Sequence, residues 1–304
     1  MRALAEYVMR GRVQAASVAL LCTFLPLVSP AVVALVTLRR GIVDGSNIAL
    51  WAFLPLVVFT VLNPTLLPVT FISLSVLVAL IGGAIVLKAG SFWPASVLGL
   101  AFIAATGGLV FGVSFPEYLN GLIEALNSAQ QEAIKASGVE DVEVTPFTHS
   151  LLAGVVAFAI AMNALMALLM GRWWQAILYN PGGFQEEFHQ LHMSKTQSLF
   201  CLGLFGISFV QSSFWFWGLL AAIPLFMVAA AIVHHRVTQK KQGVQWLVLF
   251  YILSFAVQPI LWIVLIFGFS DAWVNYRRLS DQAPSQALDD SSEDIEPKDS
   301  EPKD

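Results

Sequence analysis

The chain has 304 residues, of which 57% are hydrophobic and only 12% are charged, and its formal net charge is −4. Soluble domains carry about 25% charged residues, so this composition leaves too little polar surface to cover a water-soluble globule. It excludes a soluble enzyme, a nucleic-acid-binding protein and a secreted disulfide scaffold. We therefore predict an all-α fold, a polytopic membrane helical bundle whose first partner is the lipid bilayer.

Two unusually long apolar runs stand near the two ends of the chain. Residues 12–38 contain Pro26 and Pro30, and residues 244–270 contain Pro259. Because proline interrupts a helix, each run is either one long tilted helix or two short segments folded as a hairpin. Between them, four stretches have a length that spans a bilayer: 69–87, 92–113, 151–170 and 214–233. Shorter ones are 48–62 and 198–210, so we expect eight to ten membrane segments, including short or broken helices.

The positions of the basic residues decide between the two alternatives. If each long run is one helix, half of the sixteen Lys and Arg residues fall on each side of the membrane. If both runs fold back, thirteen fall on one side, and only Lys135 lies on the other among the internal loops. Since cytoplasmic loops are enriched in Lys and Arg, the hairpins are favoured. We therefore expect the N- and C-termini to be cytoplasmic. The short segments of such hairpins cannot cross the bilayer alone. Their free backbone groups must face protein or a water-filled cavity, which indicates a cavity beside them.

Residues 114–148 form the longest internal loop and carry apolar residues at helical spacing. These are Leu119, Leu122, Ile123, Leu126, Ala133 and Ile134. The loop is predicted to be an external amphipathic helix, which packs on the bundle or lies at the membrane interface. A role in gating a substrate is the alternative.

The segment 171–195 is predicted to form a cytoplasmic interfacial elbow. Tryptophans that follow a span favour the headgroup level, and an Asn-Pro-Gly-Gly run forms a turn. Its structural residues are Arg172, Trp173, Trp174, Asn180, Pro181, Gly182, Gly183, Phe184 and Glu187. A metal or proton site is the alternative, because Glu186, His189 and His192 follow one another at i, i+3 spacing. We expect no metal and no cofactor, since no fourth donor can be named.

Few polar groups lie at membrane depth. Four amides are the candidates for binding a neutral ligand or for pairing helices: Asn63, Asn163, Gln211 and Gln258. No charged residue lies within a span, which argues against a carboxylate proton relay or an intramembrane protease. No phosphate-binding G-x-x-x-x-G-K-[ST] loop occurs, so no ATPase is predicted in the chain. Gly108–Gly112 and Ala15–Ala19 permit close helix approach, either inside the bundle or toward a partner.

The end of the chain has a different composition. Residues 281–304 hold nine acids and two lysines and have almost nothing to bury. We therefore predict a transmembrane helical domain over residues 1–274 and a disordered acidic cytoplasmic tail over 275–304. Cys22 and Cys201 lie in apolar surroundings and predict no disulfide.

Three segments of the sequence resemble the YybS-like family of bacterial inner-membrane proteins. They are residues 25–41 with a Leu-Pro-Leu and a Leu-Arg-Arg-Gly run, residues 171–191, and residues 269–278. Asp271 and Trp273 match the D-x-W ending of the family, although Ser270 replaces a small apolar residue. The opening region is more distantly similar to the substrate-binding components of energy-coupling-factor vitamin transporters. That resemblance implies a small-molecule carrier that uses an external ATPase.

Two functions of different classes follow from these observations. The first is a small-molecule binding or transport subunit that lacks its own ATPase. The second is a membrane scaffold or assembly partner of an envelope complex, which would contact other membrane proteins. A buried, mostly apolar cavity containing Asn or Gln favours the first, and a solid interior with an exposed groove favours the second. No catalytic constellation is predicted in the spans, so we do not expect an enzyme.

Overall fold

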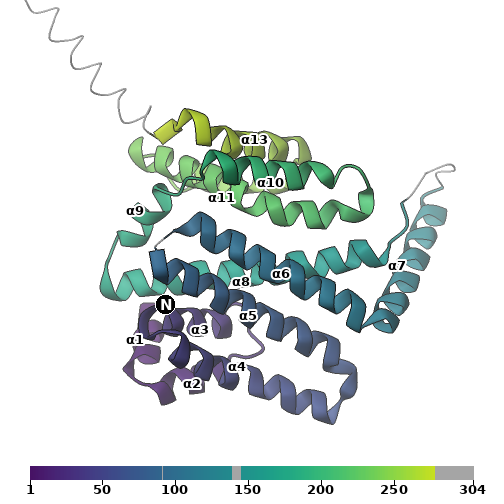
Figure 1. Cartoon of the computed structure of the whole chain (residues 1–304), viewed down its shortest axis with the longest axis horizontal. Helices are drawn as coiled ribbons and strands as arrows, with labels where there is room; N and C mark the ends of the chain where they lie inside the picture. The colour runs from purple at the N-terminus through teal and green to yellow at the C-terminus, as the bar shows by residue number, and fades with distance from the viewer. Residues whose placement is uncertain (91, 139–144, 278–304) are drawn as a thin grey trace, which may run out of the picture.

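The computed structural model describes residues 1–90, 92–138 and 145–277, and within them every regular element is a helix (Figure 1). The first eight α-helices are α1 (Arg2–Arg10), α2 (Arg12–Leu21), α3 (Val28–Arg40), α4 (Ile42–Leu62), α5 (Leu67–Gly90), α6 (Trp93–Ser114), α7 (Pro116–Ser137) and α8 (His149–Tyr179). The remaining five are α9 (Gly183–His189), α10 (Lys195–Ile207), α11 (Trp215–Gln239), α12 (Gln245–Ala256) and α13 (Gln258–Val274). Short 3-10 turns, η1 (Pro64–Leu66) and η2 (Ser212–Phe214), precede α5 and α11.

Most of the helices run along one common direction. In Figure 1, α1–α4 lie on one side, α5, α6 and α8 form the middle, and α10–α13 lie on the other side. Five helical stretches are long and apolar enough to cross a bilayer: Ile42–Leu62, Pro64–Gly90, Trp93–Ser114, His149–Tyr179 and Ser212–Gln239. The number is six if the bent pair α12 and α13 counts as one span. The chain is therefore an integral membrane protein. The expected eight to ten segments are not confirmed, because that number also counted short helices such as α2, α3 and α10.

The first apolar run folds back on itself, as the charge distribution predicted. It breaks into α2 and α3, and the Arg40 guanidinium at the end of α3 donates a hydrogen bond to the Met9 carbonyl at the end of α1 (2.8 Å). Arg12, at the start of α2, pairs with Asp44 in the first turn of α4 (2.8 Å). Both ends of the run thus lie at the same end of the bundle.

The second apolar run also returns to the end from which it starts. Between α12 and α13 the chain bends by 113°. Tyr251 of α12 hydrogen-bonds to His234 near the end of α11 (3.0 Å), and the Tyr276 carbonyl after α13 accepts a hydrogen bond from Arg236 (3.3 Å). The residues before and after the bend therefore approach the same last turns of α11.

These contacts gather the basic residues at one end of the bundle, which we call the basic end. Arg39 lies over the Tyr179 ring (4.1 Å to the centroid), which places the ends of α3 and α8 together. Gln185 of α9 hydrogen-bonds to Thr238 of α11 (3.3 Å), so α9 and the end of α11 belong there too. In Figure 1 this is the left-hand end. The opposite end, the far end, contains η1 and the Thr148–Ser213 hydrogen bond (3.1 Å).

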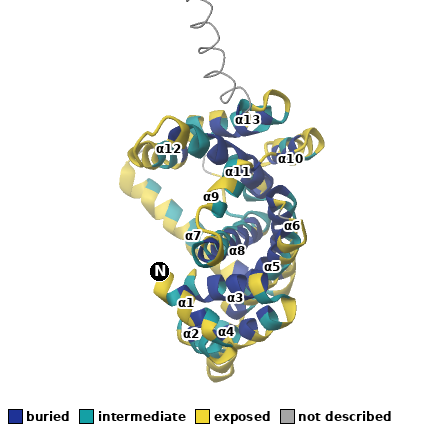
Figure 2. Cartoon of the chain, turned by 90° about the vertical axis from the view of Figure 1, so that its left-hand side faces the viewer, coloured by how far each residue is buried: buried dark blue, intermediate teal, exposed yellow. Residues whose placement is uncertain are grey.

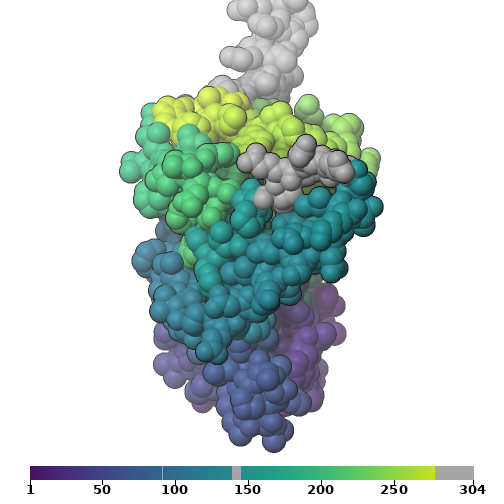
Figure 3. All heavy atoms as spheres, turned by 90° about the vertical axis from the view of Figure 1, so that its right-hand side faces the viewer, coloured from purple at the N-terminus to yellow at the C-terminus, as the bar shows by residue number. Residues whose placement is uncertain are grey.

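The predicted amphipathic helix of the long loop is confirmed as α7, which lies across the far end (Figure 3). Leu119 is fully buried and packs with Phe111 and Leu152. Ile123 and Leu126 pack partly against the same cluster, while Leu122 is exposed. The predicted apolar face is therefore used only in its first half. Residues 139–144 of the predicted loop lie outside the described residues.

Small residues let the central helices approach closely. A Cβ atom on Gly108 would lie 2.5 Å from the Ala157 Cβ and 2.7 Å from the Ala153 carbonyl, so the glycine permits the contact between α6 and α8. Ala15 and Ala19 are fully buried as well. Both small-residue pairs thus serve packing within the bundle, where buried residues concentrate (Figure 2).

Several predicted boundaries differ from the structure. The short span at 48–62 is part of a longer helix, α4, which already begins at Ile42 and includes the polar residues Asp44, Ser46 and Asn47. α8 extends to Tyr179, nine residues beyond the predicted span, so the elbow turns only at Asn180. Residues 275–277, the first of the predicted disordered tail, belong to the folded structure, since Arg277 is buried. The remainder of that tail, 278–304, lies outside the described residues.

Candidate functional site

The elbow joins α8 to the short helix α9 through a tight turn, as predicted. The Gly183 amide donates to the Asn180 carbonyl (3.0 Å), and Gly182 has φ of +90°, a conformation that residues with a Cβ rarely adopt. Pro181 fixes the first part of the turn. The Asn-Pro-Gly-Gly run therefore reverses the chain and brings α9 back beside α8.

Aromatic side chains hold the elbow against the bundle. Phe184 packs edge-on against Trp93 (6.2 Å between centroids), and Phe188 packs against His234 of α11 (5.4 Å). Trp173 is half-exposed, but Trp174 is fully buried and cannot lie at the lipid headgroups as expected. The reason is the length of α8, whose continuing helical turns direct Trp174 into the core.

A charged pair ties α9 to α8. The Arg172 Nε and Nη2 atoms both donate to Glu187 Oε2 (2.9 and 2.6 Å), and Nη1 donates to Gln175 (2.7 Å). Both charged side chains are largely buried, with 26% and 15% of their surface exposed. Hydrogen bonds between ionised groups in such surroundings are the strong ones, so the pair fixes the position of α9.

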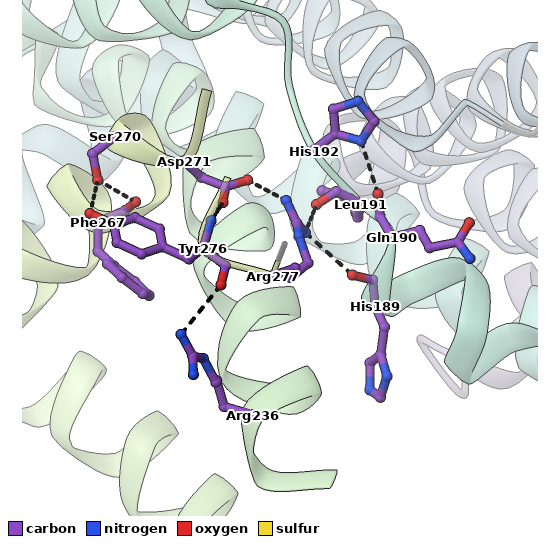
Figure 4. Close-up of polar contacts among 10 residues, drawn as sticks. All are labelled: His189, Gln190, Leu191, His192, Arg236, Phe267, Ser270, Asp271, Tyr276 and Arg277. Atoms are coloured by element: carbon purple, nitrogen blue, oxygen red, sulfur yellow. Dashed lines mark hydrogen bonds and ion pairs between the residues drawn. The ribbon is translucent and has the colours of Figure 1, made fainter. Parts of the chain in front are cut away.

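A second charged group, which sequence reasoning missed as a site, joins the segment after α13 to the elbow (Figure 4). Arg277 pairs with Asp271 of α13 and donates to the carbonyls of Leu191 and His189 (3.3 Å for His189). The Tyr276 amide donates to the other Asp271 oxygen (3.0 Å). Burial lowers the pKa of Arg277, and the Asp271 carboxylate partly counteracts that shift. The sequence does contain a signal for this pair: Asp271 lies at the end of an apolar run, and Arg277 follows six residues later.

The histidine side chains of the elbow do not converge on one point. The His189 ring packs against His235 (5.5 Å), whereas His192 hydrogen-bonds to the Gln190 carbonyl and points in another direction (Figure 4). Burial, followed by the neighbouring His235, His234 and Arg277, lowers the pKa of His189 to about 4. Among the described residues, no group of three or more His, Cys, Asp or Glu side chains could hold a metal ion.

Two cavities flank α9 at the basic end. The first, of about 410 Å³, lies between α9 and the start of α6, and we call it the polar elbow cavity. Its polar lining comes from Trp93, Arg172, Asn180, Glu186, Glu187, Gln190 and His192. The second, of about 480 Å³, lies toward α11 and is mostly aromatic. It is lined by Trp173, Phe184, Phe188, His189, His234 and Tyr251, with Leu169, Met170 and Gln185.

Two residues on the wall of the polar elbow cavity have unused hydrogen-bonding capacity. Trp93 Nε1 and Glu187 Oε1 are both buried, and neither has a hydrogen-bond partner within the described part of the chain. Leaving such a group unpaired costs about 1–3 kcal/mol, and more where it is charged. Residues that line the cavity therefore carry one donor and one acceptor without a partner in the described residues, and both atoms are covered in this conformation.

The four amides predicted as ligand or interface candidates lie in different elements. Asn63 precedes η1 and accepts hydrogen bonds from the Thr65 amide and hydroxyl (3.2 and 2.7 Å). Asn163 is half-buried in the middle of α8, Gln211 precedes η2, and Gln258 is exposed at the start of α13. None of the four lines either elbow cavity. The predicted elbow residues, by contrast, are brought together.

Comparison of the chain with protein-family models, with curated proteins and with solved structures finds no match.

Proposed function

We propose that the protein is a small-molecule binding or transport subunit of the bacterial inner membrane, and that its ligand binds in the polar elbow cavity. The observation that carries the proposal is that two residues lining the cavity each have a buried polar atom without a partner in the described residues, Trp93 Nε1 and Glu187 Oε1. Ligand pockets of about 300–1,000 Å³ with a few convergent polar groups are typical of small-molecule sites. The volume of about 410 Å³ falls within that range.

The free donor and acceptor define what the ligand presents. It offers an N–H or ammonium donor to the Glu187 carboxylate and an acceptor to the Trp93 indole. Both protein atoms are covered in this conformation, so the ligand reaches them when α9 shifts away from α8. The Gly182–Gly183 turn supplies the pivot, and the bond between Arg172 and Glu187 holds the closed position.

The orientation in the membrane follows from charge. We propose that the basic end faces the cytoplasm, with both termini on that side, because arginine and lysine are enriched in cytoplasmic loops. The two folded-back runs then enter the membrane from the cytoplasm and return, which yields eight to ten segments. A separate ATPase, as the distant resemblance to vitamin transporters implies, would bind at this end, beside α9. Membership of the YybS-like family remains part of this proposal.

Mass spectrometry of small molecules released from denatured protein tests the proposed site. The wild type should release a near-stoichiometric compound, and Glu187→Gln should release much less, because an amide cannot replace the carboxylate beside Arg172. Glu124→Gln, on α7 at the far end, makes the same chemical change and should release as much compound as the wild type. No compound in the wild type, or equal amounts in both variants, would contradict the proposal.

A scaffold is the second candidate, and the packing of the interior favours it. Large side chains fill the space between the central helices: Leu35, Leu80, Leu100, Leu165 and Leu168 are at most 1% exposed. Both elbow cavities lie at one end of the bundle and not between these leucines. A stoichiometric complex with a second membrane protein, together with no released compound, is the result that selects the scaffold.

A further inference from the structure

A groove between α2 and α4 is separate from the elbow. It has a volume of about 560 Å³. Its lining includes Arg12, Ser17, Leu21, Asp44, Asn47 and Trp51. In the membrane, such a groove on the outside of the bundle is reached from the lipid.

The chemistry of the groove changes along its length. Arg12 and Asp44 form an ion pair at the basic end (2.8 Å), and the next turns add the hydroxyl of Ser17 and the exposed amide of Asn47. Beyond them the walls become apolar and exposed, since Leu21 is 77% and Trp51 48% exposed. From Arg12 to Leu21 the helix rises about 14 Å. This sequence of charged, polar and apolar walls matches a phospholipid, from headgroup to acyl chain.

The ion pair also selects the kind of headgroup. Arg12 uses one of its nitrogens on Asp44, and 72% of its side-chain surface remains exposed, so further N–H donors are available. Asp44 keeps acceptor sites on its carboxylate, with 15% of its side chain exposed. A neutral pair of one cation and one anion complements a headgroup that itself carries a phosphate and an ammonium group. An anionic headgroup without an ammonium would offer no donor to the remaining acceptor sites of Asp44 and would add a second negative charge beside its carboxylate.

We propose that the α2–α4 groove binds one zwitterionic glycerophospholipid with a primary ammonium headgroup. The phosphate accepts hydrogen bonds from Arg12, the ammonium donates to Asp44, and one acyl chain lies along Leu21 and Trp51. A primary ammonium has N–H donors for the carboxylate, whereas the quaternary ammonium of a choline headgroup has none. The proposal is independent of any ligand at the elbow.

Native mass spectrometry of the purified full chain, loaded with defined lipids of identical acyl chains, tests this assignment. The probes are phosphatidylethanolamine, phosphatidylcholine and phosphatidylglycerol. The wild type should retain one phosphatidylethanolamine about tenfold more tightly than either other lipid, the ratio that one charge-assisted hydrogen bond supplies. Equal retention of all three lipids by the wild type would overturn the proposal without any variant.

Variants then assign the two halves of the headgroup. Asp44→Asn should remove the preference for phosphatidylethanolamine over phosphatidylcholine, and Arg12→Gln should weaken the retention of all three lipids. Glu6→Gln is the matched control, because Glu6 also pairs with an exposed arginine, Arg2 (2.9 Å), but does not line the groove. An unchanged preference in folded Asp44→Asn, or the same loss of preference in Glu6→Gln, would contradict the assignment.

Discussion

Replacing Arg277 by glutamine tests how the segment after α13 is fixed to the elbow. Arg277 is only 8% exposed, and its guanidinium contacts the Asp271 carboxylate and the backbone carbonyls of His189, at the end of α9, and Leu191. The substitution leaves the Asp271 carboxylate, 3% exposed, with the Tyr276 amide as a remaining hydrogen-bond donor. A buried negative charge then lacks its counter-ion.

The expected loss of stability is large for a single substitution. Removing one partner of a buried ion pair costs about 3–5 kcal/mol, because the remaining charge stays desolvated. Solvent screening does not reduce this figure much, since 9% and 1% of the two side chains are exposed. The Arg2–Glu6 pair, with 71% and 47% exposed, gives the contrasting case, and its loss should cost about 0.3–0.5 kcal/mol.

Equilibrium unfolding in mixed detergent micelles measures both effects. Arg277→Gln should lower the free energy of unfolding by several kcal/mol, and Arg2→Gln should leave it nearly unchanged. Adding Asp271→Asn to Arg277→Gln should restore part of the loss, because it removes the stranded charge. A loss of less than about 1 kcal/mol in Arg277→Gln, or strictly additive effects in the double variant, would refute the reasoning.

Three further predictions concern packing, the turn and pH. Gly268→Ala should destabilise by about 1–3 kcal/mol, because its Cβ would lie 2.1 Å from the Leu225 carbonyl; Gly121→Ala has open space and should not destabilise. Gly182→Val should cost about 1–3 kcal/mol through its positive φ, more than His189→Ala, as unfolding measurements would reveal. The pKa of His189 is lowered from 6.5 to about 4, so the unfolded chain binds more protons between these values. Its contribution to stability is complete above about pH 6.5 and should fall as the pH decreases toward 4, with a shallower dependence in His189→Asn.

The sequence predicts those features that depend on local geometry or on charge across the membrane. The fold-back of both apolar runs could be predicted because a bilayer sorts Arg and Lys to one side, and the contacts of Arg40 and Tyr276 agree with it. The turn at 180–183 could be predicted because proline and glycine restrict the backbone in known ways. Neither prediction requires knowing which helices touch.

Features that depend on contacts between distant segments could not be predicted. Arg277 pairs with Asp271 and also donates a hydrogen bond to the carbonyl of Leu191, 86 residues earlier in the sequence. The pair thereby links two distant segments, which the sequence does not reveal. Trp174 was expected at the membrane interface, but the length of α8 turns it into the core. The amides Asn63 and Gln258 are polar groups in an apolar sequence, and polarity alone does not indicate whether such groups converge.

The central claim is that both terminal apolar runs fold back, so that the basic end faces the cytoplasm. Single-cysteine variants in a chain lacking Cys22 and Cys201, treated with an impermeant maleimide in intact cells, test it directly. Val43→Cys and Gln242→Cys at the basic end should be labelled only after the inner membrane is permeabilised, and Ser128→Cys in α7 should be labelled before. Labelling of Val43→Cys in intact cells, with Ser128→Cys protected, would contradict the account.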